Sequence, residues 1–321
     1  MKKILLIAAA LFCSIGLVAE VNDDKPVKQS LVVQLYPTGQ ASGKGIIENG
    51  VEITKGAGED NLKRGPEVLK DDSGKVTGVG DGARMEIYIP EKPSGLMVIV
   101  CAGGSYSSLS AVNEGYCAAE WLLTRGAAVC NLFYRMPYGH KTIPLTDVQN
   151  AFRYCRHHAE EWGVSKIGIM GFSAGGHLAA CASTMYVDAA TRPDFSILCY
   201  PVISMDYDIG HDPSRNNLLG EGASSKDIKR YSLQNRVDEK TPPTLLALSS
   251  NDNRVSVQNS IQYFNALLEK GVKAQMYIYP IGGHGWGFGA PPYTSKDKLG
   301  TYRKVFAGTL ARFLEEQKDK Q

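Results

Sequence analysis

The chain has 321 residues, of which 43% are hydrophobic and 21% charged, and its formal net charge is +2 at pH 7. This composition is typical of a globular protein and excludes a disordered, collagen-like or fibrous chain. Without Lys2 and Lys3 the basic and acidic residues balance, so no charge pattern favours nucleic acid or an anionic membrane surface as a partner. Glycine is the one excess: the 34 glycines are roughly 11% of the chain, against about 7% in average proteins.

The N-terminus has the pattern of a secretory signal peptide. Lys2 and Lys3 precede an apolar run over residues 4–18, which is shorter than the roughly 20 residues that span a bilayer. We therefore predict a signal peptide over residues 1–19, and a periplasmic or secreted protein that has no membrane contact after cleavage. Lipid attachment at Cys13 and an uncleaved N-terminal anchor remain as alternatives.

Residues 20–82 differ from the rest of the chain. Eleven glycines fall between residues 39 and 82, with many charges and few aromatic residues. This pattern predicts a loop-rich N-terminal extension with a few short strands, such as one at residues 31–36. No function is assigned to this segment from its sequence.

Residues 83–321 show alternating strand and helix patterns and are predicted to form one catalytic domain. Strands are expected at residues 85–89, 96–101, 127–134, 167–170, 195–200, 244–248 and 274–279. Helices are expected at residues 112–124, 146–162, 174–185, 257–270 and 302–317. Strands that alternate with helices of this length predict an α/β fold, in which a mostly parallel central sheet has helices on both faces.

Six cysteines follow the predicted signal peptide, and none of them forms a Cys-x-x-Cys pair. Neither a zinc ribbon nor a redox motif is therefore indicated. Most of these cysteines lie in apolar strand-like or helix-like runs, which favours buried free thiols. An exported protein also permits disulfides, and the sequence does not settle the pairing.

The segment Gly171-Phe172-Ser173-Ala174-Gly175 fits the pattern Gly-x-Ser-x-Gly. It lies between a predicted strand and a predicted helix, which is the context of a nucleophile elbow. Glycines permit the tight turn, and Ser173 is expected at its tip with the positive end of a helix dipole behind it. An inert serine in a glycine-rich turn is the alternative.

A serine hydroxyl needs a base before it becomes a strong nucleophile. His284, in Gly282-Gly283-His284-Gly285-Trp286, follows the last predicted strand in a flexible loop and is the favoured base. The other histidines have weaker contexts on helices or in loops: His140, His157, His158, His177 and His211. Of these, His177 is expected to pack against its surroundings or to cap a helix.

The histidine in turn needs an acid that fixes its tautomer. Asp252 follows the strand at residues 244–248 and is favoured over the rivals Asp206, Asp208 and Asp212, which belong to an earlier and longer loop. The order Ser173, Asp252, His284 is that of the α/β hydrolases. That earlier loop, at residues 203–222, is expected to be part of a cap that sets specificity.

Backbone N–H groups must stabilise the negative charge that develops on a carbonyl oxygen. The segment Cys101-Ala102-Gly103-Gly104-Ser105-Tyr106 follows a predicted strand at the place where such an oxyanion loop belongs. We expect the donors to be the N–H groups of Gly104 and Ser105, together with that of Ala174 after the nucleophile. A plain strand-to-helix turn is the alternative.

These motifs resemble those of the α/β-hydrolase esterase/lipase superfamily, and more narrowly those of exported acetyl xylan esterase-like and feruloyl esterase-like proteins of Bacteroidetes. The matching segments are residues 98–106, 114–122, 133–137, 167–179, 192–203, 241–260 and 277–287. The resemblance implies the α/β-hydrolase fold and the triad roles of Ser173, Asp252 and His284. The sequence departs from the family where Ala102 and Ser105 replace members of a Pro-Gly-Gly-Gly or His-Gly-Gly-Gly loop.

The resemblance implies a serine carboxylesterase that hydrolyses short acyl esters, acetyl above all, of plant polysaccharide or oligosaccharide through an acyl-enzyme, and that needs no metal or cofactor. Tyr106 and Trp286 are expected to bind substrate, with simple packing as the alternative for both. Glu114 and Arg135 are expected to form an ion pair that holds loops together. A prolyl-peptidase-like hydrolase and an inactive carbohydrate-binding protein on the same fold are the other candidates. The acyl group, the sugar and the oligomeric state stay open.

Overall fold

A computed structural model describes residues 27–35, 46–48, 51–53, 68–70, 74–79, 83–289 and 296–318, with only the backbone at 46–48, 51–53 and 68–70. The predicted signal peptide over residues 1–19 lies outside these residues. Among the described helices, none is both long enough and apolar enough to cross a bilayer.

The main sheet has eight strands in the order β1-β6-β9-β7-β10-β11-β12-β13. Their bounds are β1 Val27–Gln34, β6 Arg84–Pro90, β7 Gly95–Cys101, β9 Ala128–Phe133, β10 Val164–Phe172, β11 Ser196–Cys199, β12 Thr244–Ser249 and β13 Ala274–Tyr279. The six strands from β9 to β13 in this order run parallel, whereas β6 and β1 pair antiparallel at one edge. The predicted mostly parallel sheet is confirmed.

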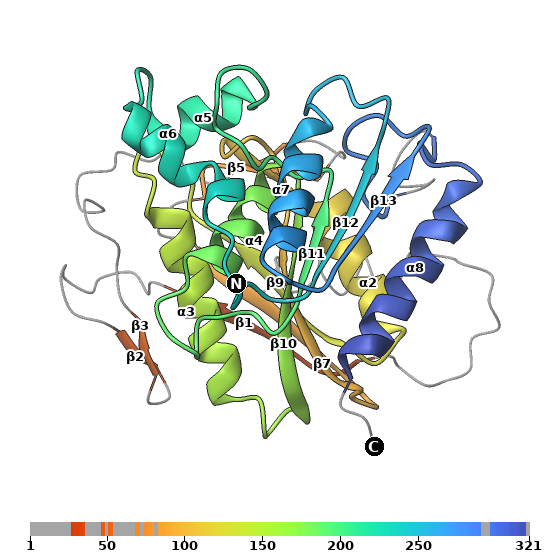
Figure 1. Ribbon diagram of the computed structural model, residues 1–321. Helices are drawn as coiled ribbons and strands as arrows, with labels where there is room; N and C mark the ends of the chain where they lie inside the picture. The colour runs from red at the N-terminus through yellow and green to blue at the C-terminus, as the bar shows by residue number, and fades with distance from the viewer. Residues whose placement is uncertain are drawn as a thin grey trace.

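Helices cover both faces of the sheet (Figure 1). On one face lie α3 (Ile143–His157), α4 (Ala174–Thr184) and α7 (Gln258–Glu269), and on the other α2 (Cys117–Leu123) and α8 (Tyr302–Gln317). Each face has its own buried apolar cluster. Strands covered on both faces are expected to be almost wholly apolar, and β7 and β9 follow that rule except at Asn131.

Part of the N-terminal extension joins this framework. Strand β1 pairs with β6 at the edge of the main sheet, and β5 (Lys75–Thr77) lies between β4 (Val68–Lys70) and β8 (Ser108–Ser110) in a three-stranded sheet. A separate hairpin consists of β2 (Ile46–Glu48) and β3 (Val51–Ile53). The domain boundary at residue 83 stays a prediction. Strand β1 lies before this boundary, but it belongs to the main sheet, whose other seven strands lie after it.

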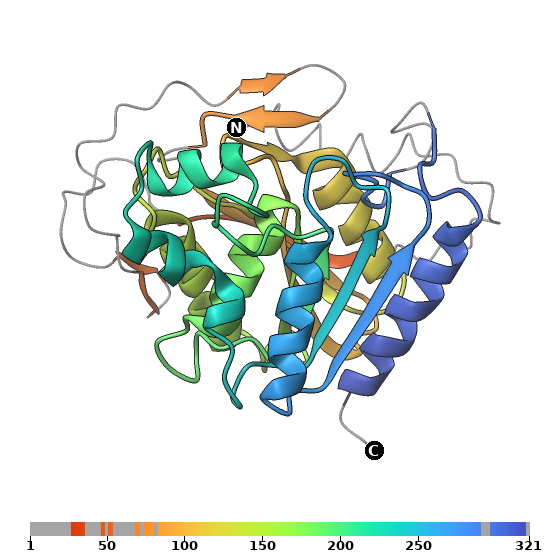
Figure 2. The same cartoon turned by 45° about the horizontal axis from the view of Figure 1, so that its top comes forward.

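The helix expected at residues 112–124 is divided in two. Residues Ala111–Tyr116 form a π-helical turn, η2, and α2 continues from Cys117. Short π-helical segments often occur at functional sites. Two further short helices, α5 (Asp212–Leu219) and α6 (Ser225–Tyr231), and the 3-10 turn η3 (Leu233–Asn235) follow β11. The two helices lie at the end toward which β11, β12 and β13 point (Figures 1 and 2).

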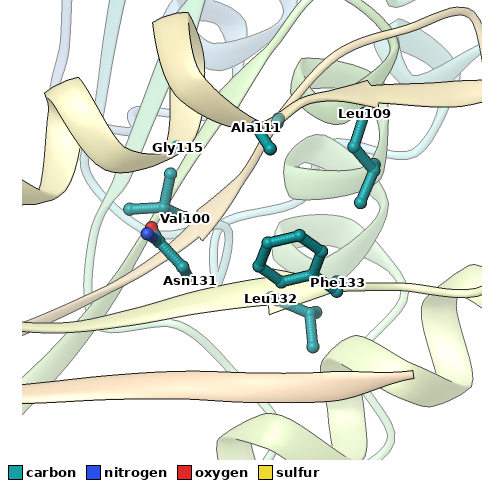
Figure 3. Close-up of a pocket in the computed structure, with 8 residues that line it drawn as sticks. Val100, Leu109, Ala111, Gly115, Asn131, Leu132 and Phe133 are labelled. Carbon is teal, nitrogen blue, oxygen red and sulfur yellow. The ribbon is translucent and has the colours of Figure 1, made fainter. Parts of the chain in front are cut away.

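A small cavity lies between η2 and the sheet. It is lined by Val100, Ala102, Leu109, Ala111, Gly115, Asn131, Leu132 and Phe133. Figure 3 shows the Asn131 amide directed toward Val100 and Gly115. Neither amide atom of Asn131 has a hydrogen-bond partner within the described residues, and an unsatisfied buried amide costs about 1–3 kcal/mol. The unsatisfied amide of Asn131 lies next to η2, the turn that carries Glu114.

All six cysteines from Cys101 to Cys199 are buried and unpaired, which confirms the prediction of free thiols for these residues. Burial raises the pKa of the Cys101 thiol well above its usual value. Cys13 lies outside the described residues.

Candidate active site

Ser173 stands alone between β10 and α4, on a very tight turn. Its φ is +53°, a value that non-glycine residues adopt only under constraint. A Cβ added to Gly171 would lie 2.2 Å from the Gly175 carbonyl oxygen, and one added to Gly175 would lie 2.1 Å from that of Cys101. Both positions therefore require glycine, and the turn has the geometry of a nucleophile elbow.

The structure brings Ser173, His284 and Asp252 into one hydrogen-bonded chain. The Ser173 Oγ–H donates to His284 Nε2 at 2.8 Å, and His284 Nδ1–H donates to Asp252 Oδ2 at 2.7 Å. The three residues come from the loops after β10, β13 and β12, which meet at the carboxyl edge of the sheet. An imidazole held in this way has its unprotonated nitrogen toward the serine.

The Asp252 carboxylate is fixed on both of its oxygens. Its Oδ1 accepts the backbone N–H groups of Arg254 (2.9 Å) and Val255 (3.0 Å), while Oδ2 faces His284. Burial alone would raise the pKa of Asp252, but the His284 hydrogen bond and charge and the two N–H groups outweigh burial and lower it. Asp252 therefore stays ionised at neutral pH and stabilises a positive His284.

The segment expected to hold an oxyanion packs against the nucleophile. A Cβ added to Gly103 would lie 2.6 Å from the Phe172 carbonyl oxygen and 2.8 Å from Ser173 Cβ. Gly104 and Ser105 both have positive φ. Within the described residues, the N–H groups of Gly104, Ser105 and Ala174 donate to no protein acceptor. Their role as oxyanion donors remains a proposal.

Tyr106 and Trp286, the residues expected to bind substrate, are both buried in the structure, which favours the packing alternative for each. Each side chain is about 1% exposed. The Tyr106 hydroxyl donates to His177 Nδ1 at 2.8 Å, and the Trp286 indole N–H donates to Ser249 Oγ at 3.1 Å. Both polar groups are satisfied inside the protein, so these aromatic residues pack in the core.

His177 is confirmed as a packing residue. Its Nε2–H donates to the Tyr231 carbonyl oxygen at 2.8 Å, and the ring is fully buried. Burial lowers the pKa of His177 to about 4. His177 is therefore neutral at pH 7 and does not compete with His284 as the base.

The expected ion pair between Glu114 and Arg135 is wrong. Arg135 forms a buried bidentate ion pair with Asp147 of α3, and Asp147 also accepts the Arg135 backbone N–H at 2.8 Å. Glu114 instead contacts the Gly103 N–H and the Tyr200 hydroxyl. The sequence shows both carboxylates and the arginine, but gives no signal that assigns the partners.

Helix α5 lies beside the triad and the oxyanion loop. Asn217 Nδ2 donates to the Ser105 carbonyl oxygen at 2.8 Å. His211, just before α5, is close enough for the charges of His284 and Asp252 to act on it; burial first, and then the charge of His284, lowers its pKa. The sequence context of His211, in a loop, gives no sign of this position.

No group of three or more histidine, cysteine or acidic residues suited to a metal ion occurs in the part of the chain that the structure describes. What the arrangement can do chemically is activate Ser173 through His284 and stabilise charge through backbone N–H groups. These are the parts needed for acyl transfer.

A family model described as the prolyl oligopeptidase family matches residues 124–302. The chain is 46% identical over 213 residues to an acetylxylan esterase of Xylanibacter ruminicola, covering 64% of this chain and 44% of that protein. It is 33% identical over 205 residues to endo-1,4-beta-xylanase B of Butyrivibrio fibrisolvens, covering 59% and 32% of the two chains. The chain thus spans less than half the length of these curated relatives.

Among solved structures, the acetyl ester-xyloside bifunctional hydrolase of Caldicellulosiruptor lactoaceticus superimposes with a TM-score of 0.64 at 30% identity. The alignment covers 80% of this chain and 97% of that one. The family match includes β10, α4 and the loops that carry all three residues of the hydrogen-bonded chain. The fold, the order of these residues and the match together show that the chain belongs to the prolyl oligopeptidase family of α/β hydrolases.

Proposed function

We propose that the protein is a serine carboxylesterase that removes short acyl groups, acetyl above all, from plant polysaccharide or oligosaccharide. The observation that carries the proposal is the His284 imidazole, bonded to Ser173 on one side and to Asp252 on the other. The substrate class is supported by relatives that are named as an acetylxylan esterase, a xylanase and an acetyl ester-xyloside hydrolase.

The first half of the reaction forms an acyl-enzyme. Ser173 Oγ attacks the ester carbonyl carbon while its proton passes to His284 Nε2. The carbonyl oxygen becomes an oxyanion, which the N–H groups of Gly104, Ser105 and Ala174 would stabilise. When the tetrahedral intermediate collapses, the His284 proton passes to the departing sugar oxygen, and the acyl group stays on Ser173.

The second half repeats these steps with water. His284 takes a proton from water, the hydroxide attacks the acyl carbon, and the proton returns to Ser173 Oγ as the acid leaves. Asp252 remains a carboxylate throughout and stabilises each imidazolium. In each half, one bond to the acyl carbon forms and one breaks.

Hydrolysis of p-nitrophenyl acetate by the wild type and by Ser173→Ala tests the reaction. We expect the variant to lose about 10⁵-fold or more in kcat, as when the nucleophile of a triad is removed. Equal rates would refute the assignment, and so would failure of a fluorophosphonate probe to label Ser173 in the folded protein. A panel of acetylated xylan, feruloylated oligosaccharide and p-nitrophenyl esters of increasing chain length then identifies the acyl group and the carrier.

A peptidase is the second candidate, because the family model and an Arabidopsis thaliana acylamino-acid-releasing enzyme, 31% identical over 143 residues, support it. Turnover of aminoacyl-proline substrates without ester hydrolysis would favour this candidate. Export through residues 1–19 is a separate proposal, and fractionation of cells that express the chain with and without those residues tests it.

A further inference from the structure

A buried chain of hydrogen bonds joins the oxyanion loop to the loop of the catalytic histidine. The Gly103 N–H donates to Glu114 Oε2 at 2.7 Å, and the Tyr200 hydroxyl donates to Glu114 Oε1 at 2.8 Å. The same Tyr200 oxygen accepts the Gly287 N–H at 2.9 Å. Two side chains therefore connect the backbone beside Ser173 to the backbone three residues after His284.

Only a carboxylate satisfies both ends of this chain at Glu114. Each of its oxygens receives a different donor, and the side chain is 4% exposed. Glutamine has one oxygen and one NH₂ group, so at position 114 it could accept the Gly103 N–H but would have to donate to the Tyr200 oxygen, and the Tyr200 O–H would lose its acceptor. Burial raises the pKa of Glu114, while the Gly103 N–H, the Tyr200 hydroxyl and the charges of His284 and Lys298 act to lower it.

Tyr200 touches the histidine as well as the carboxylate. Its ring packs edge-on against the His284 imidazole, with centroids 5.0 Å apart, and against Trp286 at 4.8 Å. It directly follows β11 with a φ of +37°, a strained conformation for a large residue that the surroundings must hold in place. The backbone of Tyr200 is therefore held at the end of β11, and its hydroxyl by Glu114 of η2 and by the loop that carries His284.

Asn113, the neighbour of Glu114 in η2, holds the same histidine loop at other points. Its Nδ2 donates to the Gly285 carbonyl oxygen at 3.1 Å, and its Oδ1 accepts the Gly289 N–H at 2.7 Å. Its backbone oxygen accepts the Phe288 N–H at 3.1 Å. Two successive side chains of the π-helical turn therefore bind the two loops: Asn113 the histidine loop and Glu114 the oxyanion loop.

We propose that Glu114 and Tyr200 are positioning residues that set the distance between the oxyanion loop and His284. This proposal rests on the esterase function proposed above. In this proposal neither side chain contacts substrate. Glu114 acts through Gly103, and Tyr200 acts through Gly287 and the His284 ring. A displacement of about 1 Å caused by a residue outside the reacting atoms can cost about 100-fold in rate.

The experiment measures kcat and KM of Glu114→Gln, Tyr200→Phe and the double variant with p-nitrophenyl acetate. We expect kcat to fall by about 10- to 100-fold in each single variant, with KM changed much less. Because the two residues belong to one chain, the double variant should lose little more than the worse single variant. The acid limb of the kcat/KM profile should move to lower pH in Glu114→Gln, which loses a negative charge near His284, but not in Tyr200→Phe, which keeps it.

Tyr263→Phe is the matched control. Tyr263 is a fully buried tyrosine of α7 whose hydroxyl has no hydrogen-bond partner among the described residues, so its removal should leave kcat unchanged. Near-ultraviolet circular dichroism and fluorophosphonate labelling show which variants fold with a reactive Ser173. If Glu114→Gln does not fold, Tyr200→Phe alone tests the proposal.

Wild-type kcat in a folded Tyr200→Phe or Glu114→Gln protein overturns the proposal, and so do fully additive losses in the double variant. Failure of the proposed function gives a different result, because ester hydrolysis would then survive Ser173→Ala in the wild-type background.

Discussion

Replacing Asp252 by asparagine tests the proposed catalytic chain through the tautomer of His284. The Oδ1 atom of Asp252 accepts two backbone N–H groups, from Arg254 and Val255. An asparagine must keep its oxygen at that position, so its NH₂ group has to face His284 Nδ1. That nitrogen then becomes an acceptor, the ring proton moves to Nε2, and Nε2 can no longer take the proton of Ser173.

The size of the effect follows from losing the base while the geometry stays intact. The same change in a serine protease triad lowers kcat by about 10⁴-fold, or about 5.4 kcal/mol at 1.36 kcal/mol for each factor of ten. We expect a loss of this order in kcat for p-nitrophenyl acetate at pH 7, with a thermal unfolding midpoint close to that of the wild type. The local hydrogen bonds to Arg254 and Val255 survive in the variant, so the fold should too.

Asp208→Asn is the matched control, because Asp208 is an exposed acid of the loop that held the rival candidates. It should leave kcat unchanged. A kcat for Asp252→Asn within tenfold of the wild type would refute the reasoning, and a large loss in Asp208→Asn would show that the wrong acid was assigned.

Two predictions concern stability. Gly175→Ala should destabilise the protein by about 1–3 kcal/mol or more in urea unfolding, since the new Cβ would lie 2.1 Å from the Cys101 carbonyl oxygen. Gly308→Ala is the control in α8, where no atom lies within 4 Å of the added Cβ, and it should stabilise the protein by about 0.5–1 kcal/mol. Equal effects of the two substitutions would contradict the steric argument. The pKa of His177 is lowered from 6.5 to about 4, so the unfolded chain binds more protons between these values and stability falls as pH drops through that window. The wild type should lose about 2 kcal/mol more than His177→Gln between pH 7 and pH 5, and parallel losses in the two proteins would show that His177 is not held neutral.

Much of the fold is predictable from the sequence because strand and helix patterns in the region from β6 to α8 follow local rules. The strand expected at residues 274–279 and the helix at 302–317 coincide with β13 and α8. The predicted bounds of an element are wrong where tertiary packing overrides the local preference of the sequence. The expected helix at 112–124 is interrupted by η2, and α5 and α6 lie in a polar segment without a clear helical periodicity.

The residues of the candidate site likewise fall into those that the sequence predicts and those whose orientation it does not predict. Ser173, Asp252 and His284 are recognisable because each follows a strand of a parallel sheet, so their neighbourhood is implied by topology. The positions of Tyr106 and Trp286 beside functional loops predict contact with substrate, but a position along the chain does not determine which way a side chain points. Both point inward, where His177 and Ser249 satisfy their polar atoms.

The role of Glu114 shows why such partners escape sequence reasoning. A buried carboxylate is costly unless donors surround it, and from the sequence the obvious donor was Arg135. The structure pairs that arginine with Asp147 and gives Glu114 two uncharged donors instead. Both donors are uncharged, so the cations whose charges act on this carboxylate are His284 and Lys298, which lie outside the chain of bonds. The positive form of His284 arises in each half of the proposed reaction. A neutral hydrogen-bonding residue could join two loops, but it would not favour the imidazolium, and the Glu114→Gln pH profile separates these two contributions.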